Sequence, residues 1–291
     1  MSWTLYFGSL IALAIGLRLI WEIRTKACYN PKAKMPEGWN QFGALNELKI
    51  LIIGDQGSGD KYQKAVALAA EQIASARGAD LVLLLGDNFI QEGVADLEDP
   101  QWQSKFEEIY RLDLPFFAVL GNHDFKGNYL AQIHYSEKNR RWRMPAATYQ
   151  FEAGPVAFYA VNTTCSICSF WSLFKKTAQP WRVAFGHHPV LSSGRHGSML
   201  SLERWVVKKS GVQFYLSGHH HLLEHIALEG LDQITSGAGG TNLNETAERD
   251  LAGKAFYRLD HGFVWAHFTQ TQASFHFFDT QGEEHYQFSR S

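Results

Sequence analysis

Five short segments contain residue types that bind metal ions and act on phosphate. They are GDQG (54–57), GDN (86–88), GNHD (121–124), GHH (186–188) and GHHH (218–221). Carboxylate and amide oxygens together with imidazole nitrogens form a mixed donor set that suits Zn²⁺, Mn²⁺ or iron. One carboxylate can bridge two such ions about 3.5–4 Å apart, the spacing used in two-metal phosphate chemistry. The pattern therefore predicts a two-metal site.

Each residue of these segments also has an ordinary structural interpretation. Asp55 and Asp87 could cap helices, and Asn122 could occupy a turn. A single His at the end of a strand is more often structural than a ligand. Five such segments in one chain, each with a Gly just before the candidate ligand or its triplet, favour the metal site.

A nucleotide-binding P-loop at GDQGSGDK is another alternative. Gly54 and Gly59 have the required separation. Asp60 stands where the pattern needs Lys, however, and no Ser or Thr follows Lys61. The loop therefore fails the pattern.

The five segments all end apolar stretches that are typical of buried strands. These stretches are 48–55, 81–87, 115–124, 182–189 and 212–221. Strands that alternate with helices form mostly parallel, buried sheets. Ligands of such sheets bind beyond the carboxyl ends of the strands. The ordering of the segments therefore predicts that the five sets of polar side chains converge.

Helices are expected between these strands, and more strand after them. Asp60 can cap a helix that runs to about Arg77, with Gly78 as its stop. Further helices are expected at 101–111 and 199–209. The tail from about Ala255 to Arg290 is typical of a β-meander, with turns near Asp260, Thr271 and Gly282. The expected fold class is α/β, with two packed mixed β-sheets flanked by helices.

The order GD, GD, GNH, GH and GH-x-H resembles that of the calcineurin-like metallophosphoesterases. Within them the chain is most similar to the small purple acid phosphatases of the tartrate-resistant type. The resemblance covers roughly residues 47–291 and includes LLLGDNF, LGNHDFKGNYLAQI, RRWRMP, GHHPV, SGAGG and GFVWAHF. It implies the four-layer fold of that family.

The resemblance also assigns roles by position. It implies that Asp87 bridges both metals, that Asp55 and His221 bind the first, and that the second takes the remaining three ligands, Asn122, His187 and His219. His123 resembles a histidine that contacts phosphate, and His196 resembles a second histidine over the substrate pocket. Asp124 is expected to orient His123.

One departure from the family pattern concerns the first metal. Purple acid phosphatases continue the GDN motif to a tyrosine that binds ferric iron, and here that position is Ile90. Other branches place a His two residues after the first Asp, where this chain has Gly57. Ferric iron and the purple colour are therefore disfavoured, and two divalent ions (Mn, Zn or Fe) are expected.

The expected activity is hydrolysis of a phosphate monoester by a metal-bound hydroxide in the dinuclear site. The substrate would be a phosphorylated small molecule or a phosphoprotein. Two alternatives stay open: a phosphodiesterase or nucleotide hydrolase on the same scaffold, and a non-catalytic phosphate-binding homologue, which the loss of the ligand at Ile90 motivates.

Composition limits the other classes of function. The chain has 291 residues, of which 45% are hydrophobic, enough for one large core. Lys and Arg number 27 against 29 Asp and Glu, so no basic surface for nucleic acid is expected. Cys165 and Cys168 form a C-x-x-C that lacks a second pair for zinc, which favours ordinary thiols or a local disulfide.

The N-terminal residues 1–24 form an apolar segment, and residues 25–46 are expected to link it to a catalytic domain at 47–291. Arg18 is the only charged residue from Trp3 to Trp21, so residues 3–21 could attach the chain to a membrane. Basic residues follow this stretch rather than precede it, which favours a retained anchor over a cleaved signal. The same positive charges favour a cytoplasmic location for the catalytic domain. A soluble apolar helix is the remaining alternative.

Overall fold

The computed structural model describes residues 30–42, 45–164, 167–194, 196–243 and 251–291. The apolar segment expected as a membrane anchor lies outside these residues. Within the described ranges, no helix is long and apolar enough to cross a membrane.

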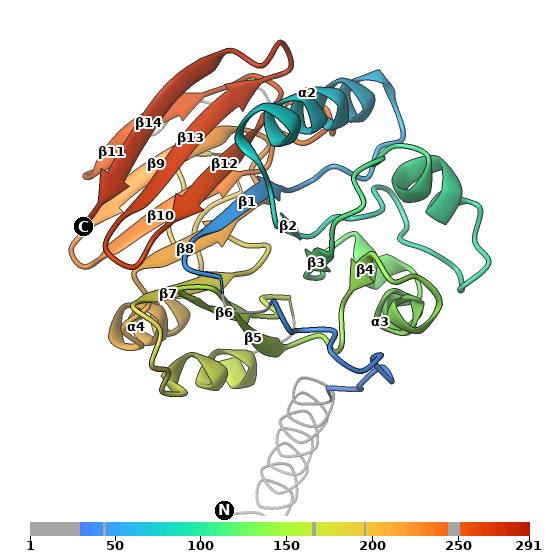
Figure 1. The fold of residues 1–291 in the computed structure, drawn as a ribbon, viewed down its shortest axis with the longest axis horizontal. Coiled ribbons are helices and arrows are strands. Elements are labelled where there is room, and N and C mark those ends of the chain that lie inside the picture. Colours follow the sequence, from blue (N-terminus) through green and yellow to red (C-terminus); the bar gives the residue numbers. More distant parts are fainter. Residues whose placement is uncertain (1–29, 43–44, 165–166, 195, 244–250) are drawn as a thin grey trace, which may run out of the picture.

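Two seven-stranded mixed sheets pack against each other, as Figure 1 shows, and this confirms the expected fold class. The first sheet has the order β14-β13-β12-β1-β2-β3-β4 and the second β11-β9-β10-β8-β7-β6-β5. The strands of the first sheet are β1 (Leu48–Ile53), β2 (Leu81–Leu84), β3 (Phe116–Ala118), β4 (Trp142–Arg143), β12 (Gly262–Phe268), β13 (Ala273–Asp279) and β14 (Glu284–Arg290). Those of the second are β5 (Tyr149–Ala153), β6 (Val156–Ala160), β7 (Trp181–Phe185), β8 (Phe214–Ser217), β9 (Leu223–Leu228), β10 (Leu231–Ser236) and β11 (Lys254–Arg258).

The middle of each sheet is parallel. β1, β2 and β3 run parallel in the first sheet, and β6, β7 and β8 in the second. Their side chains are almost all fully buried because apolar residues cover both faces. One core cluster joins the sheets and includes Ile52, Leu83 and Phe117 from the first with Phe185 and Ile234 from the second.

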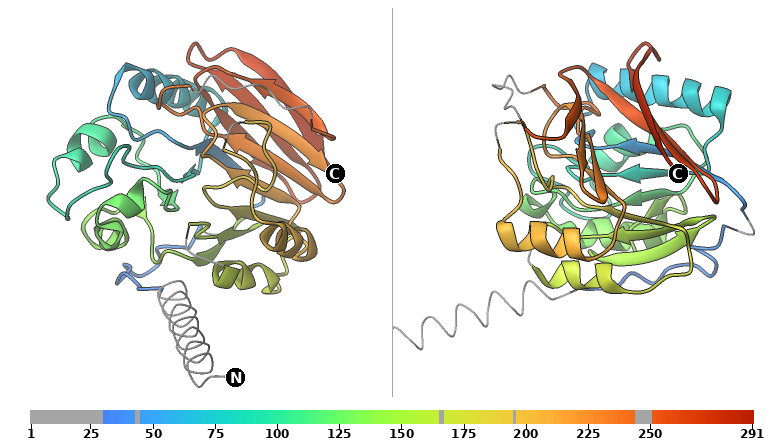
Figure 2. Two further views of the ribbon diagram at one scale, coloured as in Figure 1. Left: turned by 180° about the vertical axis from the view of Figure 1, so that it is seen from behind. Right: turned by 90° about the vertical axis from the view of Figure 1, so that its left-hand side faces the viewer.

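The helices lie outside the sheets (Figures 1 and 2). α2 (Lys61–Arg77) begins at Asp60, whose Oδ1 accepts the N–H of Tyr62 at 2.8 Å, and ends at Gly78 with φ of 84°. Both expected ends are therefore confirmed. The other helices are η1 (Gln103–Glu107), η2 (Asp124–Lys126), α3 (Tyr129–Lys138), η3 (Ile167–Phe174) and α4 (Ser201–Lys209). The expected helix at 101–111 is shorter, with η1 wound as a π-helix.

The expected meander at the C-terminal end is correct only for β12, β13 and β14. β11 pairs with β9 in the second sheet instead. The edges of β12 are already bonded to β1 and β13, so no edge remains for β11.

Part of the segment expected as a linker packs onto the domain. The rings of Trp39 and Phe42 lie 6.2 and 5.8 Å from that of Phe117, and Lys32 forms a β-bridge with Ala146. Residues 30–42 are therefore held against the catalytic domain rather than spaced away from it.

Cys168 of the C-x-x-C motif is disulfide-bonded.

Candidate metal centre

The carboxyl ends of five strands converge between the two sheets. Asp55 follows β1, Asp87 follows β2 and Asn122 follows β3, whereas His187 follows β7 and His219 follows β8. Ligand atoms of Asp55, Asp87 and His187 all lie within 4.8 Å of one another, and all three side chains are buried. The structure therefore brings together side chains that are far apart in the sequence.

His187 is the centre of one set of donor atoms. Its Nδ1 lies 2.9 Å from the carbonyl oxygen of Leu85 and donates to it, so Nε2 carries a lone pair. This Nε2 lies 3.1 Å from Oδ1 of Asn122 and 3.2 Å from Nδ1 of His219. It also lies 3.5 Å from Oδ1 of Asp87. Four candidate ligands of the second metal thus face one point.

Asp55 and His221 form the second set. Nδ1 of His221 donates to the carbonyl oxygen of Asn242 at 2.7 Å, which leaves the lone pair of Nε2 facing Oδ1 of Asp55 at 3.5 Å. That Oδ1 atom is buried and has no hydrogen-bond partner. A buried carboxylate oxygen in this state is unfavourable unless a cation compensates it.

These distances fit metal ions. Ligand atoms about 2.1 Å from a tetrahedral ion lie about 3.4 Å apart. The donor pairs described above are separated by 3.1, 3.2, 3.5 and 3.5 Å. Among the described residues, no Lys or Arg forms an ion pair with Asp55 or Asp87. The residues present therefore fit the binding of metal cations.

Backbone strain is concentrated at the same residues. Asp55, Asp87 and His219 have φ of 55°, 51° and 68°, and they are three of the four non-Gly residues with positive φ in the described ranges. This conformation costs an L-residue roughly 1–2 kcal/mol. Strain of this kind gathers where a site fixes its side chains.

The glycines that precede the candidate ligands are needed mainly because the chain passes close to other groups of the site. Only Gly86 among them has positive φ, of 88°. At Gly121 a Cβ would lie 2.2 Å from Oδ1 of Asp87, and at Gly218 it would lie 2.3 Å from Oδ2 of Asp55. These glycines therefore allow the chain to pass close to the carboxylates.

The first metal position has fewer ligands than the second. A side chain at Gly57 would place its Cβ 2.2 Å from the carbonyl oxygen of Asn88, so this backbone has no room for a His there. Ile90 is partly buried, and its N–H donates to the carbonyl oxygen of Gly57 at 2.8 Å. The candidate protein donors at this position are therefore Asp55, Asp87 and His221.

The electrostatics lower the pKa of some histidines of the site and raise that of others. Burial, together with the neighbouring histidines, lowers the pKa of His219, and it lowers the pKa of His188 to about 3. Burial also opposes protonation of His187, but the charges of Asp87 and Asp55 outweigh it and raise the pKa. Burial likewise opposes protonation of His221, but the hydrogen bond and charge of Asp55 outweigh it and raise its pKa. Neutral imidazoles are the form that binds metals.

His123 lies beside the carboxylate of Asp87. Its backbone N–H donates to Oδ1 of Asp87 at 2.9 Å, and its Nε2 lies 4.0 Å from Oδ2 of the same residue. Its Nδ1 lies 3.2 Å from the carbonyl oxygen of Gln91 and 3.1 Å from Nζ of Lys126. Lys126 thus places a positive charge next to His123, which the sequence did not indicate.

Asp124 does not orient His123 as expected. Its Oδ2 accepts the N–H of Gly121 at 2.8 Å, and its Oδ1 accepts Nε2 of Gln132 at 2.8 Å. Further donors are the backbone N–H groups of Asn88 and Phe89, both at 3.2 Å. Burial, followed by the charge of Asp87, raises the pKa of Asp124 to about 7. Asp124 therefore ties together the loops that carry Asp87 and Asn122.

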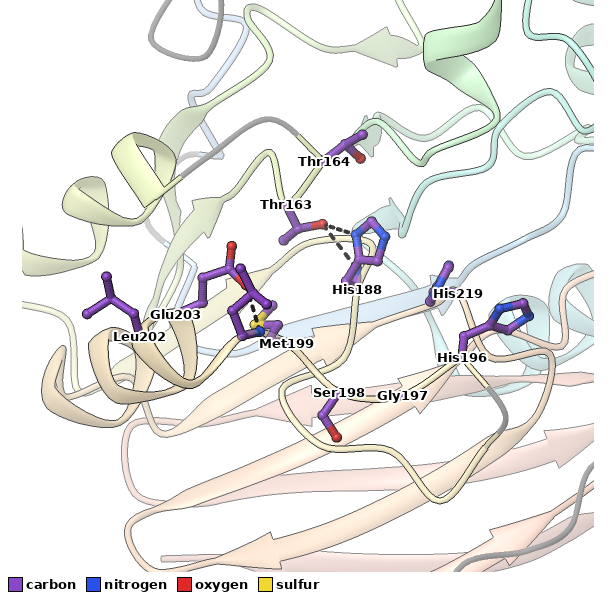
Figure 3. Close-up of a pocket in the computed structure, with 11 residues that line it drawn as sticks. Thr163, Thr164, His188, His196, Gly197, Ser198, Met199, Leu202, Glu203 and His219 are labelled. Carbon is purple, nitrogen blue, oxygen red and sulfur yellow. Dashed lines mark hydrogen bonds between the residues drawn. The ribbon is translucent and has the colours of Figure 1, made fainter. Parts of the chain in front are cut away.

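A pocket of about 580 Å³ opens next to the second metal position (Figure 3). His188, His196 and His219 lie on its wall, and the ring of His196 is 4.9 Å from that of His219. The pocket continues past Met199 to Leu202. His196 is therefore part of the wall of this pocket, and its role toward a substrate stays a prediction.

His188 and Thr163 contribute to this wall, and sequence reasoning gave neither a role. Oγ1 of Thr163 accepts the N–H of His188 at 3.0 Å and lies 2.8 Å from its Nδ1. One hydroxyl group therefore holds both the backbone and the ring of His188 in place. Thr163 follows the buried strand β6. The apolar run of this strand is the sequence signal that could have indicated a site residue just after it.

Three comparisons with known proteins agree with one another. A model of the calcineurin-like phosphoesterase family matches residues 48–223. Purple acid phosphatase 3 of Arabidopsis thaliana is 28% identical over 279 residues, which cover 81% of this chain and 75% of that protein. Human tartrate-resistant acid phosphatase type 5 is 29% identical over 245 residues, which cover 68% of this chain and 74% of that protein.

A solved structure is similar over most of the chain. It is described as GAP50, the anchor in the inner membrane complex of Plasmodium. It is 25% identical with a TM-score of 0.73, and the match covers 84% of this chain and 88% of that one.

Proposed function

This chain belongs to the calcineurin-like phosphoesterase family, and we propose that it is a phosphatase that hydrolyses phosphate monoesters in a site for two metal ions. The family match spans more than half of the chain, and the similarity to purple acid phosphatases extends over most of it. Membership makes the chain a phosphatase of the hydrolase class. The monoester preference and the dinuclear mechanism are the proposal.

One observation carries the proposal more than any other. Oxygen and nitrogen lone pairs from Asp55, Asp87, Asn122, His187, His219 and His221 face one another at ligand spacing. When bound, two cations would neutralise the phosphate charge and make water acidic enough to act as the nucleophile. The reduced donor set around Ile90 favours divalent ions such as Mn²⁺, Zn²⁺ or Fe²⁺ over ferric iron.

The remaining residues bind the phosphate group and handle protons. His188 lines the pocket as a neutral imidazole, since burial lowers its pKa to about 3. His123 and His196 stabilise developing negative charge or protonate the leaving oxygen. Lys126 beside His123 increases the positive potential on that side.

A second candidate is a non-catalytic binding protein. The specific observation in its favour is the missing ligand at Ile90, together with the absence of room at Gly57. The similar structure described as an anchor is consistent with such a role for a chain of this fold. Against it, both candidate phosphate-facing histidines and six candidate ligands are in place.

Turnover of model substrates separates these possibilities. p-Nitrophenyl phosphate is a monoester and bis-p-nitrophenyl phosphate is a diester with the same leaving group. We expect the monoester to be hydrolysed at least about tenfold faster, because its dianion takes more charge stabilisation from two cations. Faster diester hydrolysis would make the chain a phosphodiesterase, and no turnover of either compound would favour the binding protein.

A further inference from the structure

Five of the eight large hydrophobic side chains that are exposed in the described ranges gather on two neighbouring helices. η3 and α4 contact each other, and their outer side is called here the η3/α4 face. It is formed by Trp171, Phe174, Leu200, Leu202 and Trp205. A cluster of this size on a folded domain usually marks a binding surface.

The exposure does not arise because the helices are badly packed. Phe170 and Leu173 of η3 and Val206 and Val207 of α4 are buried in a single core cluster. The opposite side of each helix is nevertheless apolar, with Trp171 62% exposed and Trp205 54% exposed. The inner side of each helix thus already packs into the core, whereas the apolar outer side stays exposed to solvent.

Basic residues adjoin this face in the sequence. Lys175 and Lys176 directly follow η3, and α4 carries Arg204, Lys208 and Lys209. The only acid in these two stretches is Glu203, whose Oε2 accepts the N–H of Leu200 at the start of α4 at 3.0 Å. Exposed tryptophans with basic neighbours are the combination that binds the surface of an anionic bilayer.

The substrate pocket opens at the same face. Leu200 and Leu202 belong both to the η3/α4 face and to the pocket wall. Figure 3 shows Leu202 and Met199 toward one end of the pocket and His219 and His196 toward the other. A single substrate molecule can therefore place its apolar part at the η3/α4 face and its phosphate next to His219.

The start of the described chain lies at this end of the molecule. The dark-blue segment 30–42 runs along the same end of the molecule as α4 in Figures 1 and 2. In the sequence, Asn30 is preceded by the apolar stretch from Trp3 to Trp21. A membrane is therefore a better occupant for this face than a soluble protein.

We propose that the η3/α4 face rests on an anionic lipid bilayer and that the substrates are phosphorylated lipids, with the phosphate at the metal centre and the apolar part at Leu200 and Leu202. This inference rests on the proposed monoester hydrolysis and names its substrate class. Water forms the new bond to phosphorus, the ester P–O bond breaks, and a proton from the water ends on the lipid alcohol. Diacylglycerol phosphate would thus give diacylglycerol and inorganic phosphate.

The test uses the full chain with vesicles of phosphatidylcholine and phosphatidylserine that carry diacylglycerol phosphate. Trp171→Glu and Trp205→Glu place a charge on the η3/α4 face outside the pocket. We expect each to lower phosphate release from vesicles by about tenfold, since each removes a buried aromatic contact with the bilayer. Hydrolysis of soluble p-nitrophenyl phosphate should stay within about twofold. Leu68→Glu is the matched control, because Leu68 is 57% exposed on α2, away from this face.

A second readout does not depend on catalysis. Brominated lipids should quench the fluorescence of the wild-type chain more than that of Trp171→Phe or Trp205→Phe. Equal quenching and unchanged vesicle hydrolysis in the variants would overturn the inference while the monoesterase stands, and would leave a protein partner for this face. If the wild-type chain does not hydrolyse p-nitrophenyl phosphate at all, the proposed function is overturned, and the substrate class with it.

Discussion

The backbone N–H of His219 donates a hydrogen bond of 2.7 Å to Oδ2 of Asp55, although 164 residues separate them in the chain. Asp55 lies at the end of β1 in the first sheet, and His219 lies at the end of β8 in the second. The candidate metal centre therefore exists only when the two sheets are packed together. This explains why each half of the chain carries part of the ligand set.

Restoration of a phenol at position 90 should change the metal preference. Ile90→Tyr adds a side chain where the related phosphatases have their iron ligand, and ferric iron prefers such a hard oxygen donor. We expect the variant loaded with ferric iron to gain a visible absorption band that the wild type lacks.

Gly57→His provides the contrast for this experiment. Its Cβ would collide with the carbonyl group of Asn88, so it should not supply a working ligand. The account of the first metal position is contradicted if Ile90→Tyr stays colourless or if Gly57→His raises metal affinity.

Loss of Asp124 should cost stability. Asp124→Ala leaves the N–H groups of Gly121, Asn88 and Phe89 without their buried acceptor. We expect the free energy of unfolding, measured with urea, to fall by about 3 kcal/mol.

Asp113→Ala is the control for this change. The ion pair of Asp113 with Arg140 is exposed on both sides, so the effect should stay within about 0.5 kcal/mol. Equal effects of the two substitutions would show that Asp124 does not hold the loops together.

His123 should affect turnover rather than stability. His123→Asn removes the ring that lies beside Asp87, and general acid–base or oxyanion contacts of this kind contribute about 100-fold or more to kcat. Stopped assays with p-nitrophenyl phosphate at saturating metal would measure the loss. His134→Asn, which alters an exposed pair with Glu137, should leave kcat unchanged. A His123→Asn enzyme with wild-type kcat would remove His123 from the mechanism.

Asp232 should make stability depend on acid pH. Burial opposes its ionisation, but hydrogen bonds from His225 and Arg290 outweigh this and hold the pKa of Asp232 below its ordinary value. A depressed carboxyl pKa adds stability that is present above the unfolded pKa, about 4, and is lost as pH falls through the folded one. The free energy of unfolding should therefore fall more steeply below about pH 4 in the wild type than in Asp232→Asn. Parallel curves would contradict this.

The sequence predicted the five strand ends and α2 because their signals are local. Continuous apolar runs that stop at Gly-Asp or Gly-His mark buried strands, and Asp60 and Gly78 mark the ends of a helix. The fold class and the family resemblance were confirmed by the structure and the comparisons. The metal ligands and catalytic residues stay predictions that the experiments here address.

Other elements could not be predicted because their stability comes from distant partners. β9 and β10 contain buried Glu224, His225, Asp232 and Gln233, which periodicity would assign to the surface. The role of Asp124 depends on contacts with a loop 36 residues earlier in the chain. Thr163 acquires its position only when β6 pairs with β7. None of these relationships leaves a pattern in nearby residues.

The most direct test of the account is hydrolysis of p-nitrophenyl phosphate by the full chain after chelation, with Mn²⁺, Zn²⁺, Fe²⁺ or Mg²⁺ added back one at a time. We predict that chelation abolishes turnover and that at least one divalent ion restores it. In Asp87→Asn, loss of the shared carboxylate should lower activity by about 100-fold or more, because even residues that only support metal ligands cost about 10–100-fold. Turnover that survives both chelation and Asp87→Asn would contradict the two-metal site.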